Sequence, residues 1–560
     1  MRRKDKRMKT FFFNEKGEST AALKWLFLLS ATVLSGLLSV KGEVVWIAVS
    51  VVCAAAVLCL LVFRFRFLEH IFSSLSRKRA VLSGILAAYA AYWYASVFYD
   101  RLYRVAEELG SRRAAELIGR FGAAFSIVAG ILSVLALFAY LYWFIGWFAG
   151  RMRRLAQGSD SVERWFLIGA MAAAILVIVL VYRQTTVFYS PNGDADNVWD
   201  KIDIVYSSDT ASLVEQNVFL NVAAAENDIR QPLFGVFAAP FALCASLLAR
   251  LTFLPNAYCV LLQIVQALLM MLSLIMLSRM LRLYGFEKAL FLALIGVSYP
   301  TLLFLLNIEQ YIFPVFWMTL LIWQYVTQNG DGRECAWIAA SGSMLTSGVL
   351  ILLVPPDGSP GERVRAGLLA ILKFAAVVLL FGRAAMVLSS AESVRFLLQF
   401  AGEKLPLTER LMQYANFVSA CFAAPAAEIV QYSSELTVFH QSAATGWNAA
   451  GVVLFAAAAA GFFTNRKNVF AKICFGWVAF SFLLLCLVGW GTSENGLVLY
   501  TLYFSWAFVS LIVLLVRRVF EKFYALRCAV LSAGALAMLV LNVQGISEIV
   551  RFGLQYYPAK

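Results

Sequence analysis

Acidic side chains gather in one polar interval of the chain, Asp194 to Phe241, which lies between two strongly apolar stretches. Its acids are Asp194, Asp196, Asp200, Asp203, Asp209, Glu215, Glu226 and Asp228, and its only bases are Lys201 and Arg230. Carboxylates held in a folded loop can accept protons or bind divalent cations. A linker between membrane helices needs only a few residues, whereas this interval is long enough to fold and fix a carboxylate. We therefore expect the chemistry of the protein here.

Metal binding is one chemistry that these acids could support. Asp194 and Asp196 form a D-x-D pair, which is compatible with an oxygen-ligand site for magnesium or manganese. A solvated acidic loop is the simpler interpretation of the same pair. Only two histidines are present, which excludes a histidine-rich metal site. The nine cysteines show no CxxC pair and most lie in apolar runs, so we interpret them as small core residues.

Composition predicts an all-α polytopic membrane protein. The chain has 560 residues, of which 61% are hydrophobic and 14% charged, with a mean hydropathy of +0.77. Soluble domains are about a quarter charged. The net charge of +14 does not indicate a nucleic-acid partner, because the basic residues cluster in short loops between apolar runs. Such clusters mark cytoplasmic loops and suit anionic lipid headgroups. The basic segment before Thr20 therefore predicts a cytoplasmic N-terminus.

The apolar runs predict roughly 13 spans in one membrane-embedded body. They cover about 23–41, 43–63, a third run ending near Tyr99, 121–149, 165–183, 258–278, 288–306, 311–327, 367–390, 447–463, 470–490, 497–516 and 526–548. Segment 336–354 is expected to be broken or re-entrant. We expect 232–252 to lie along the outer surface, because this places the basic turn near Arg279 inside and Glu309 on the same face as Asp209.

Two regions follow from this map. Residues 1–164 form an N-terminal module of four additional spans, and residues 165–560 form the main transmembrane body. The body carries two long outer segments, the acidic loop 184–231 and a second segment 391–446.

The main body resembles a known family of membrane enzymes. Asp209 opens an outer loop, and Arg230-Gln231-Pro232-Leu233 forms a corner before the next apolar run. A span then ends at Arg279, Ser298-Tyr299-Pro300 lies near the top of its successor, and Glu309 follows. From about 165 to 326 this order resembles the GT-C glycosyltransferases, in particular the group of protein mannosyltransferases and the lipid A aminoarabinose transferase. The chain departs from that pattern where Thr210 replaces a second acid and a single proline replaces two.

The resemblance implies a function and a set of site residues. It implies a GT-C-like helical bundle in the plasma (inner) membrane that moves a sugar from a polyprenyl-phosphate donor to an extracytoplasmic acceptor, with membrane lipids as further partners. Asp209 would be the catalytic base or would orient the acceptor hydroxyl. Arg230, Gln231, Glu309 and Glu215 would contact substrate, with Arg230 stabilising the phosphate charge. The resemblance implies no particular cofactor, and a divalent cation, magnesium or manganese, is compatible with it.

Simpler roles remain open for each of these residues. Asp209 could only cap the following helix, Glu309 could only flank a turn at the membrane interface, and Arg230 could form a surface ion pair with Asp228. At the level of function, a lipid-linked glycan flippase or transporter is the main alternative. Transporters usually show related halves and charges deep within spans, which this chain lacks apart from Arg383. A non-catalytic envelope-assembly subunit is a third possibility, since the first four spans could serve assembly.

Overall fold

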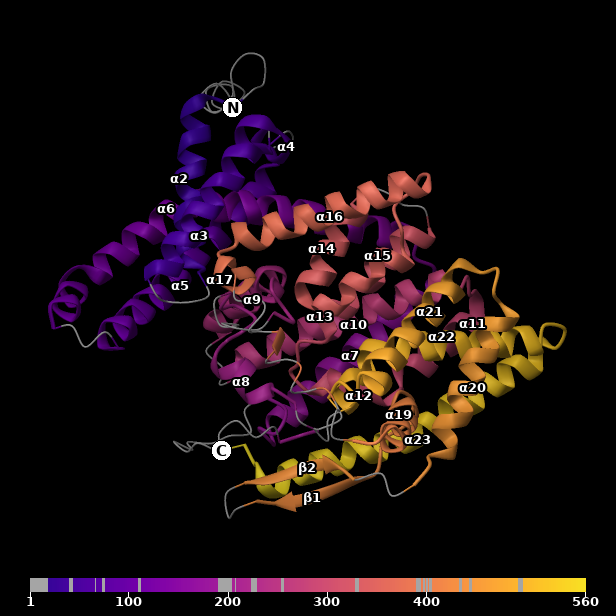
Figure 1. Cartoon of the computed structure of the whole chain (residues 1–560). Coiled ribbons are helices and arrows are strands. Elements are labelled where there is room, and N and C mark those ends of the chain that lie inside the picture. The colour runs from indigo at the N-terminus through magenta and orange to yellow at the C-terminus, as the bar shows by residue number, and fades with distance from the viewer. Residues whose placement is uncertain are drawn as a thin grey trace. The chain divides into compact units, whose positions relative to one another are not determined.

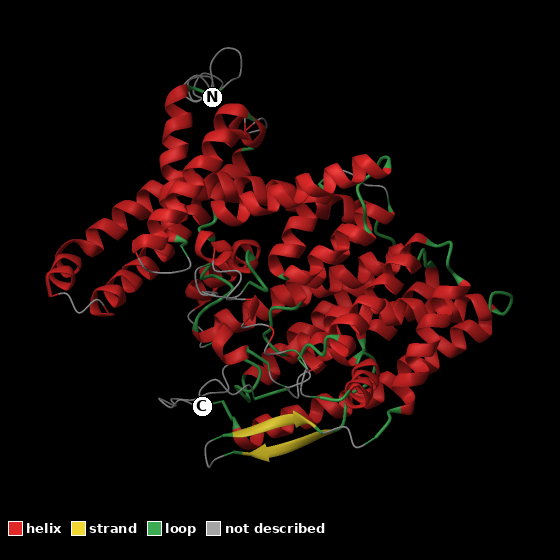
Figure 2. Cartoon of the chain, in the orientation of Figure 1, coloured by secondary structure: helices red, strands yellow, loops and turns green. Residues whose placement is uncertain are grey.

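The fold is that of a helical membrane protein, seen in a computed structural model of the chain (Figure 1). The structure describes residues 19–559 except 40–43, 66, 73–75, 109–111, 190–203, 207, 223–228, 253–255, 328–331, 389–393, 396–397, 399–400, 402–404, 433–435, 443–445 and 492–496. Helices dominate these residues, and the only two named strands among them form one hairpin (Figure 2).

The first of two compact units contains residues 1–158, 218–247 and 368–393. Its helices are α2 (Ala21–Leu37), α3 (Val44–Cys59), a π-helical extension η1 (Leu60–Arg64), α4 (Phe67–Phe72), α5 (Arg77–Glu108), α6 (Arg112–Gln157), most of α9 (Phe234–Thr252), the end of α16 (Pro360–Leu380) and α17 (Ala384–Leu388). The expected module 1–164 thus falls largely in this unit, which also takes in two later segments.

The second unit contains residues 159–217, 248–367 and 394–560. Its elements are α7 (Ser161–Tyr182), α8 (Thr210–Glu215), α10 (Ala257–Met280), α11 (Gly285–Gly296), α12 (Tyr299–Leu306), α13 (Ile312–Val326), α14 (Arg333–Ser343), η2 (Leu345–Val349), α15 (Leu350–Leu353), α19 (Leu407–Ala420), β1 (Ala427–Gln431), β2 (Thr437–Gln441), α20 (Ala449–Thr464), α21 (Val469–Ser481), η3 (Phe482–Leu487), η4 (Leu497–Tyr500), α22 (Thr501–Val519) and α23 (Tyr524–Tyr556). The hairpin lies beside α23 (Figure 1).

The predicted class of multi-pass, all-α membrane protein is confirmed. Among the described residues, nine helices are long and apolar enough to cross a membrane. A tenth span results if α11 and α12, which bend by 60° at their junction, are counted together, and three further apolar helices are shorter. The total of about 13 spans stays a prediction. So does the interfacial placement of 232–252, because α9 is itself long and apolar enough to cross.

The segment expected to be broken does change conformation. Helix α14 ends at Ser343, Met344 is extended with φ −154° and ψ 110°, and the 3-10 helix η2 follows. The indole nitrogen of Trp337 donates to the carbonyl of Gly348 at 3.2 Å, which folds η2 back onto α14. Serines and glycines at this break favour the end of the helix, because serine side chains compete for backbone hydrogen bonds and glycine loses more backbone entropy in a helix.

Charges at one end of the second unit join its helices. The carboxylate of Glu163, only 1% exposed, accepts from Arg279 at 2.5 Å and from Lys288 at 2.8 Å. Lys288 also binds Asp160 at 2.5 Å. Burial opposes ionisation of Asp160, but the hydrogen bond from Lys288 and the amide of Glu163 outweigh it and lower its pKa. The network therefore ties the start of α7 to α10 and α11, and two cations of the expected basic turn are neutralised.

In the first unit, the end of α2 is held by close backbone packing. Gly382 has φ +76°, and a Cβ on it would lie 2.6 Å from the carbonyl oxygen of Ser35. The neighbouring Arg383 is 1% exposed and donates from Nε to the carbonyl of Pro232 at 3.1 Å and from a terminal nitrogen to that of Leu38 at 3.4 Å. A glycine is therefore required for this approach, and Arg383 joins three separate segments.

This packing predicts the effect of one added methyl group. Gly382→Ala should destabilise the first unit by at least about 2 kcal/mol, because left-handed strain and overpacking against backbone each cost roughly 1–3 kcal/mol. Gly84→Ala is the matched control, since no heavy atom lies within 4 Å of its added Cβ in the interior of α5 and alanine favours the helix. Thermal unfolding in detergent micelles measures both changes. Equal unfolding temperatures for the two variants would contradict the proposed contact.

Candidate functional site

Two loops of the second unit meet at the Asp209–Glu309 corner, which we define as residues Ser208–Thr210 and Asn307–Gln310. The backbone N–H of Asp209 donates to Oε1 of Glu309 at 2.8 Å. The other oxygen of Glu309 accepts from the backbone N–H of Gln310 at 3.0 Å. The hydroxyl of Thr210 donates to Oδ1 of Asn307 at 3.1 Å. The structure thus brings together the two acids that the topology argument placed on one face.

Helix ends position both loops. Helix α12 begins with Pro300 in its first turn, where the missing N–H is tolerated, and it ends at Leu306. The hydroxyl of Tyr182, the last residue of α7, donates to the carbonyl of Leu306 at 2.6 Å. On the other side, the amide of Leu213 donates to the carbonyl of Asp209 at 2.9 Å, so Asp209 directly precedes α8 and its carbonyl accepts a hydrogen bond of the first turn. That the Asp209 side chain caps this helix stays a prediction.

Burial separates the two acids. Glu309, Asn307 and Thr210 are each 1% exposed, whereas Asp209 is partly exposed. Both carboxylate oxygens of Glu309 accept backbone hydrogen bonds, which makes Glu309 an anchor for the loop that carries Asp209. Asp209 is consequently the acid of this pair that a substrate can reach.

The other expected site residues are distributed differently. Arg230 and Gln231 belong to the first unit, where the carbonyl of Gln231 accepts from the amide of Phe234 at 3.2 Å. Glu215 is exposed at the last position of α8. Asp194 and Asp196 lie outside the described residues. Within the described part of the chain, no group of three or more His, Cys, Asp or Glu side chains could hold a metal ion.

The β-hairpin, which sequence reasoning missed, supports the corner. Strand β1 pairs antiparallel with β2, and β2 forms a parallel bridge to Val205 through Phe439. The amide of Phe439 donates to the carbonyl of Ile204 at 2.8 Å, and the amide of Tyr206 donates to the carbonyl of Phe439 at 3.0 Å. The alternation in 427–441 could have indicated strands, but not this distant pairing.

Titratable groups on this support are held in their neutral forms. Burial raises the pKa of Tyr206, and its hydrogen bond with Tyr299 offsets only part of that shift. Burial lowers the pKa of His440, although Glu428, its partner across the hairpin, acts in the opposite direction. These groups therefore contribute hydrogen bonds rather than charges next to the corner at neutral pH.

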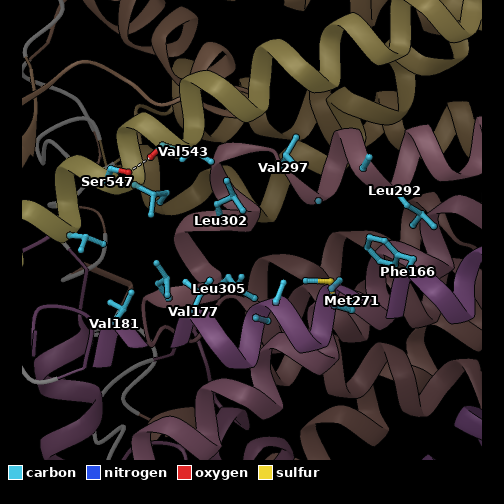
Figure 3. A pocket seen from close by; sticks show the side chains of 18 of the residues that line it. Phe166, Val177, Val181, Met271, Leu292, Val297, Leu302, Leu305, Val543 and Ser547 are labelled. Atoms are coloured by element: carbon cyan, nitrogen blue, oxygen red, sulfur yellow. Dashed lines mark hydrogen bonds between the residues drawn. The ribbon is translucent and has the colours of Figure 1, made fainter. Parts of the chain in front are cut away.

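The second unit also contains an apolar cavity of about 660 Å³. It is lined by α7, α10, α11, α12 and α23, and Figure 3 shows the side chains of α7 and α23 on opposite sides of those of α12. The lining on α7 runs from Phe166 to Val181, about 22 Å along a helix. On α12 it extends to Leu306, and only two residues, Asn307 and Ile308, separate Leu306 from Glu309, a span of about 11 Å of chain at most. Arg551 is the one cation among the lining residues.

Comparison with known proteins adds no relative. No protein family, no characterised protein and no solved structure matches the chain. The resemblance to the GT-C glycosyltransferases therefore rests on the residues of this sequence alone.

The corner predicts a specific role for Glu309. Glu309→Gln should loosen the Asp209 loop, because an amide has one acceptor oxygen where the carboxylate has two, and its NH2 group must face a backbone donor. A buried donor without a partner costs about 1–3 kcal/mol. Faster hydrogen exchange at Asp209 and Gln310 measures the effect, and Glu215→Gln, at an exposed position, is the control. Unchanged exchange in Glu309→Gln would refute the anchoring role.

Proposed function

We propose that the protein is a membrane glycosyltransferase that moves a sugar from a polyprenyl-phosphate donor to the hydroxyl of an acceptor on the outer face of the plasma (inner) membrane. The observation that carries the proposal is the long apolar cavity, whose lining on α12 extends to Leu306, three positions before the buried, anchored Glu309. An extended hydrocarbon chain fits such a cavity, and its polar head would emerge at the Asp209–Glu309 corner. The resemblance from 165 to 326 supports the same assignment.

The shape of the cavity favours a lipid chain over a compact ligand. Its lining is almost entirely apolar, and it follows α7 over about 22 Å, which is most of the roughly 30 Å hydrocarbon thickness of a bilayer. Small-molecule sites usually combine an apolar wall with several convergent polar groups. Here the only polar side chains among the lining residues are Ser547 and Arg551, which lie about one turn apart on α23. That asymmetry matches a lipid with a phosphate at one end.

The proposed reaction assigns a proton acceptor and a leaving group. The acceptor oxygen forms a bond to the anomeric carbon while the bond from that carbon to the phosphate oxygen breaks. The proton of the acceptor hydroxyl passes to the carboxylate of Asp209. The polyprenyl phosphate leaves as an anion, so a nearby cation stabilises the charge that develops. Arg551, which lines the cavity, is the candidate for this cation in the second unit.

Photocrosslinking tests occupancy of the cavity. A photoreactive residue placed at Val177, which lines the cavity, should crosslink added polyprenyl phosphate more strongly than one at the neighbouring Leu176, which does not line it. Both positions are exposed on α7, at 39% and 59%, so general contact with lipid is similar. Mass spectrometry of the adducts measures the ratio. Equal labelling at the two positions would show that the cavity has no preference for this lipid.

Substitution of Asp209 tests the chemistry. Asp209→Asn keeps the shape of the side chain and the backbone hydrogen bond to Glu309, but it cannot accept the proton. Transfer should fall about 100-fold or more, the usual scale for a lost acid–base group, while crosslinking at Val177 persists. Glu215→Gln should leave the transfer rate within a few-fold of wild type if Glu215 contributes only to binding. Near-normal transfer by Asp209→Asn would remove Asp209 as the base.

A further inference from the structure

Tyr206 has a backbone conformation that a bulky residue rarely adopts. Its φ is +51°, in the left-handed region. Among the described residues, the other non-glycine positions with positive φ are Asn217, Asn256 and Arg282. Asparagine tolerates this region, whereas a tyrosine there costs on the order of 1–3 kcal/mol and persists only when the surroundings fix it. Tyr206 lies three residues before Asp209, so this strained position directs the chain into the corner.

Contacts from three directions fix Tyr206. The side chain is 1% exposed. Its amide donates to the carbonyl of Phe439, and its ring packs edge-on against the ring of Phe439, with centroids 5.4 Å apart. Its hydroxyl accepts a hydrogen bond from the hydroxyl of Tyr299 at 2.9 Å. Two residues later, the amide of Ser208 donates to the carbonyl of Val205 at 3.0 Å and closes the turn.

Tyr299 is itself rigidly held. Its amide donates to the carbonyl of Phe422 at 3.2 Å. The side-chain amide of Asn542 on α23 donates to the carbonyls of Phe422 and Val297 at 2.7 Å each. At Gly545, a Cβ would lie 3.4 Å from the ring of Tyr299, so α23 also packs closely against that ring. Helix α12 therefore holds the Asp209 loop at both of its ends, through Tyr299 at the start and through Asn307 and Glu309 after the end.

We propose that the hydrogen-bonded pair Tyr206–Tyr299 is a positioning device that fixes the direction of the Asp209 carboxylate. The pair does not touch substrate, and it acts through the turn that joins Tyr206 to Asp209. Its role in transfer rests on the proposed function, whereas its effect on the order of the loop does not. A strained residue held by a buried hydroxyl pair keeps the loop in one conformation before substrate binds, which raises the rate of the chemical step.

Removal of single hydroxyl groups tests the pair. Tyr299→Phe removes the donor and Tyr206→Phe removes the acceptor, and both keep the rings. Tyr503→Phe is the matched control, because Tyr503 is 2% exposed in the same unit and its hydroxyl bonds Ser347 at 2.6 Å, away from the loop. Hydrogen exchange at Ser208, Asp209 and Leu213 should accelerate about tenfold in each test variant, the factor that one net hydrogen bond contributes. The control should leave it unchanged.

Two further measurements make the proposal specific. The double variant Tyr206→Phe/Tyr299→Phe should exchange no faster than either single variant, because one shared bond is lost in all three. In transfer assays, kcat should fall about tenfold with KM within twofold of wild type, since substrate contacts are intact.

Unchanged exchange in both single variants overturns the positioning role. Accelerated exchange with a normal kcat overturns its role in transfer. Wild-type protein that fails to transfer would reject the proposed function while the exchange result still decides on the loop.

Discussion

The candidate site depends on the hydrogen bonds that the buried carboxylate of Glu309 accepts. A carboxylate that is 1% exposed requires compensation, and Glu309 obtains part of it from the amides of Asp209 and Gln310. Hydrogen bonds to a charged group contribute roughly 1.5–3 kcal/mol each. This is large compared with the intrinsic stability of α8, which has only six residues and would not form alone. The short helix and the loop before it are therefore ordered by the acid that they contact.

The bend between α11 and α12 makes this arrangement possible. A straight helix through Gly285–Leu306 would keep the carbonyl of Val297 in its own hydrogen-bond ladder. The 60° bend frees the carbonyl of Val297, which Asn542 then satisfies from α23. Pro300 cannot continue a hydrogen-bonded helix from α11 but suits the first turn of a new one. The polar contacts of Tyr299 and Asn307 are thus located at the two ends of a helix of eight residues.

Sequence reasoning reached the class of fold, for a physical reason that can be named. Hydropathy is a sum over many residues, so it identifies the membrane helices. Counting charges in loops placed Asp209 and Glu309 on one face of the membrane. The structure brings their two loops into contact, while the face itself stays a prediction. The bridge from the hairpin to Val205 and the left-handed Tyr206 could not be predicted, because both depend on partners more than 90 residues away.

The corner separates two requirements of the proposed reaction that one acid cannot meet. A proton acceptor must be reachable by substrate, and its direction must also be fixed before substrate arrives. Full burial would fix Asp209 but exclude the acceptor hydroxyl. Full exposure would leave the side chain of Asp209 free to adopt several rotamers, and ordering it would cost entropy in each productive encounter. In this structure the backbone of Asp209 is fixed by the buried Glu309, while its side chain stays partly exposed. Because the main chain of Asp209 makes the hydrogen bond that fixes the loop, the carboxylate of Asp209 does not have to bind the loop itself.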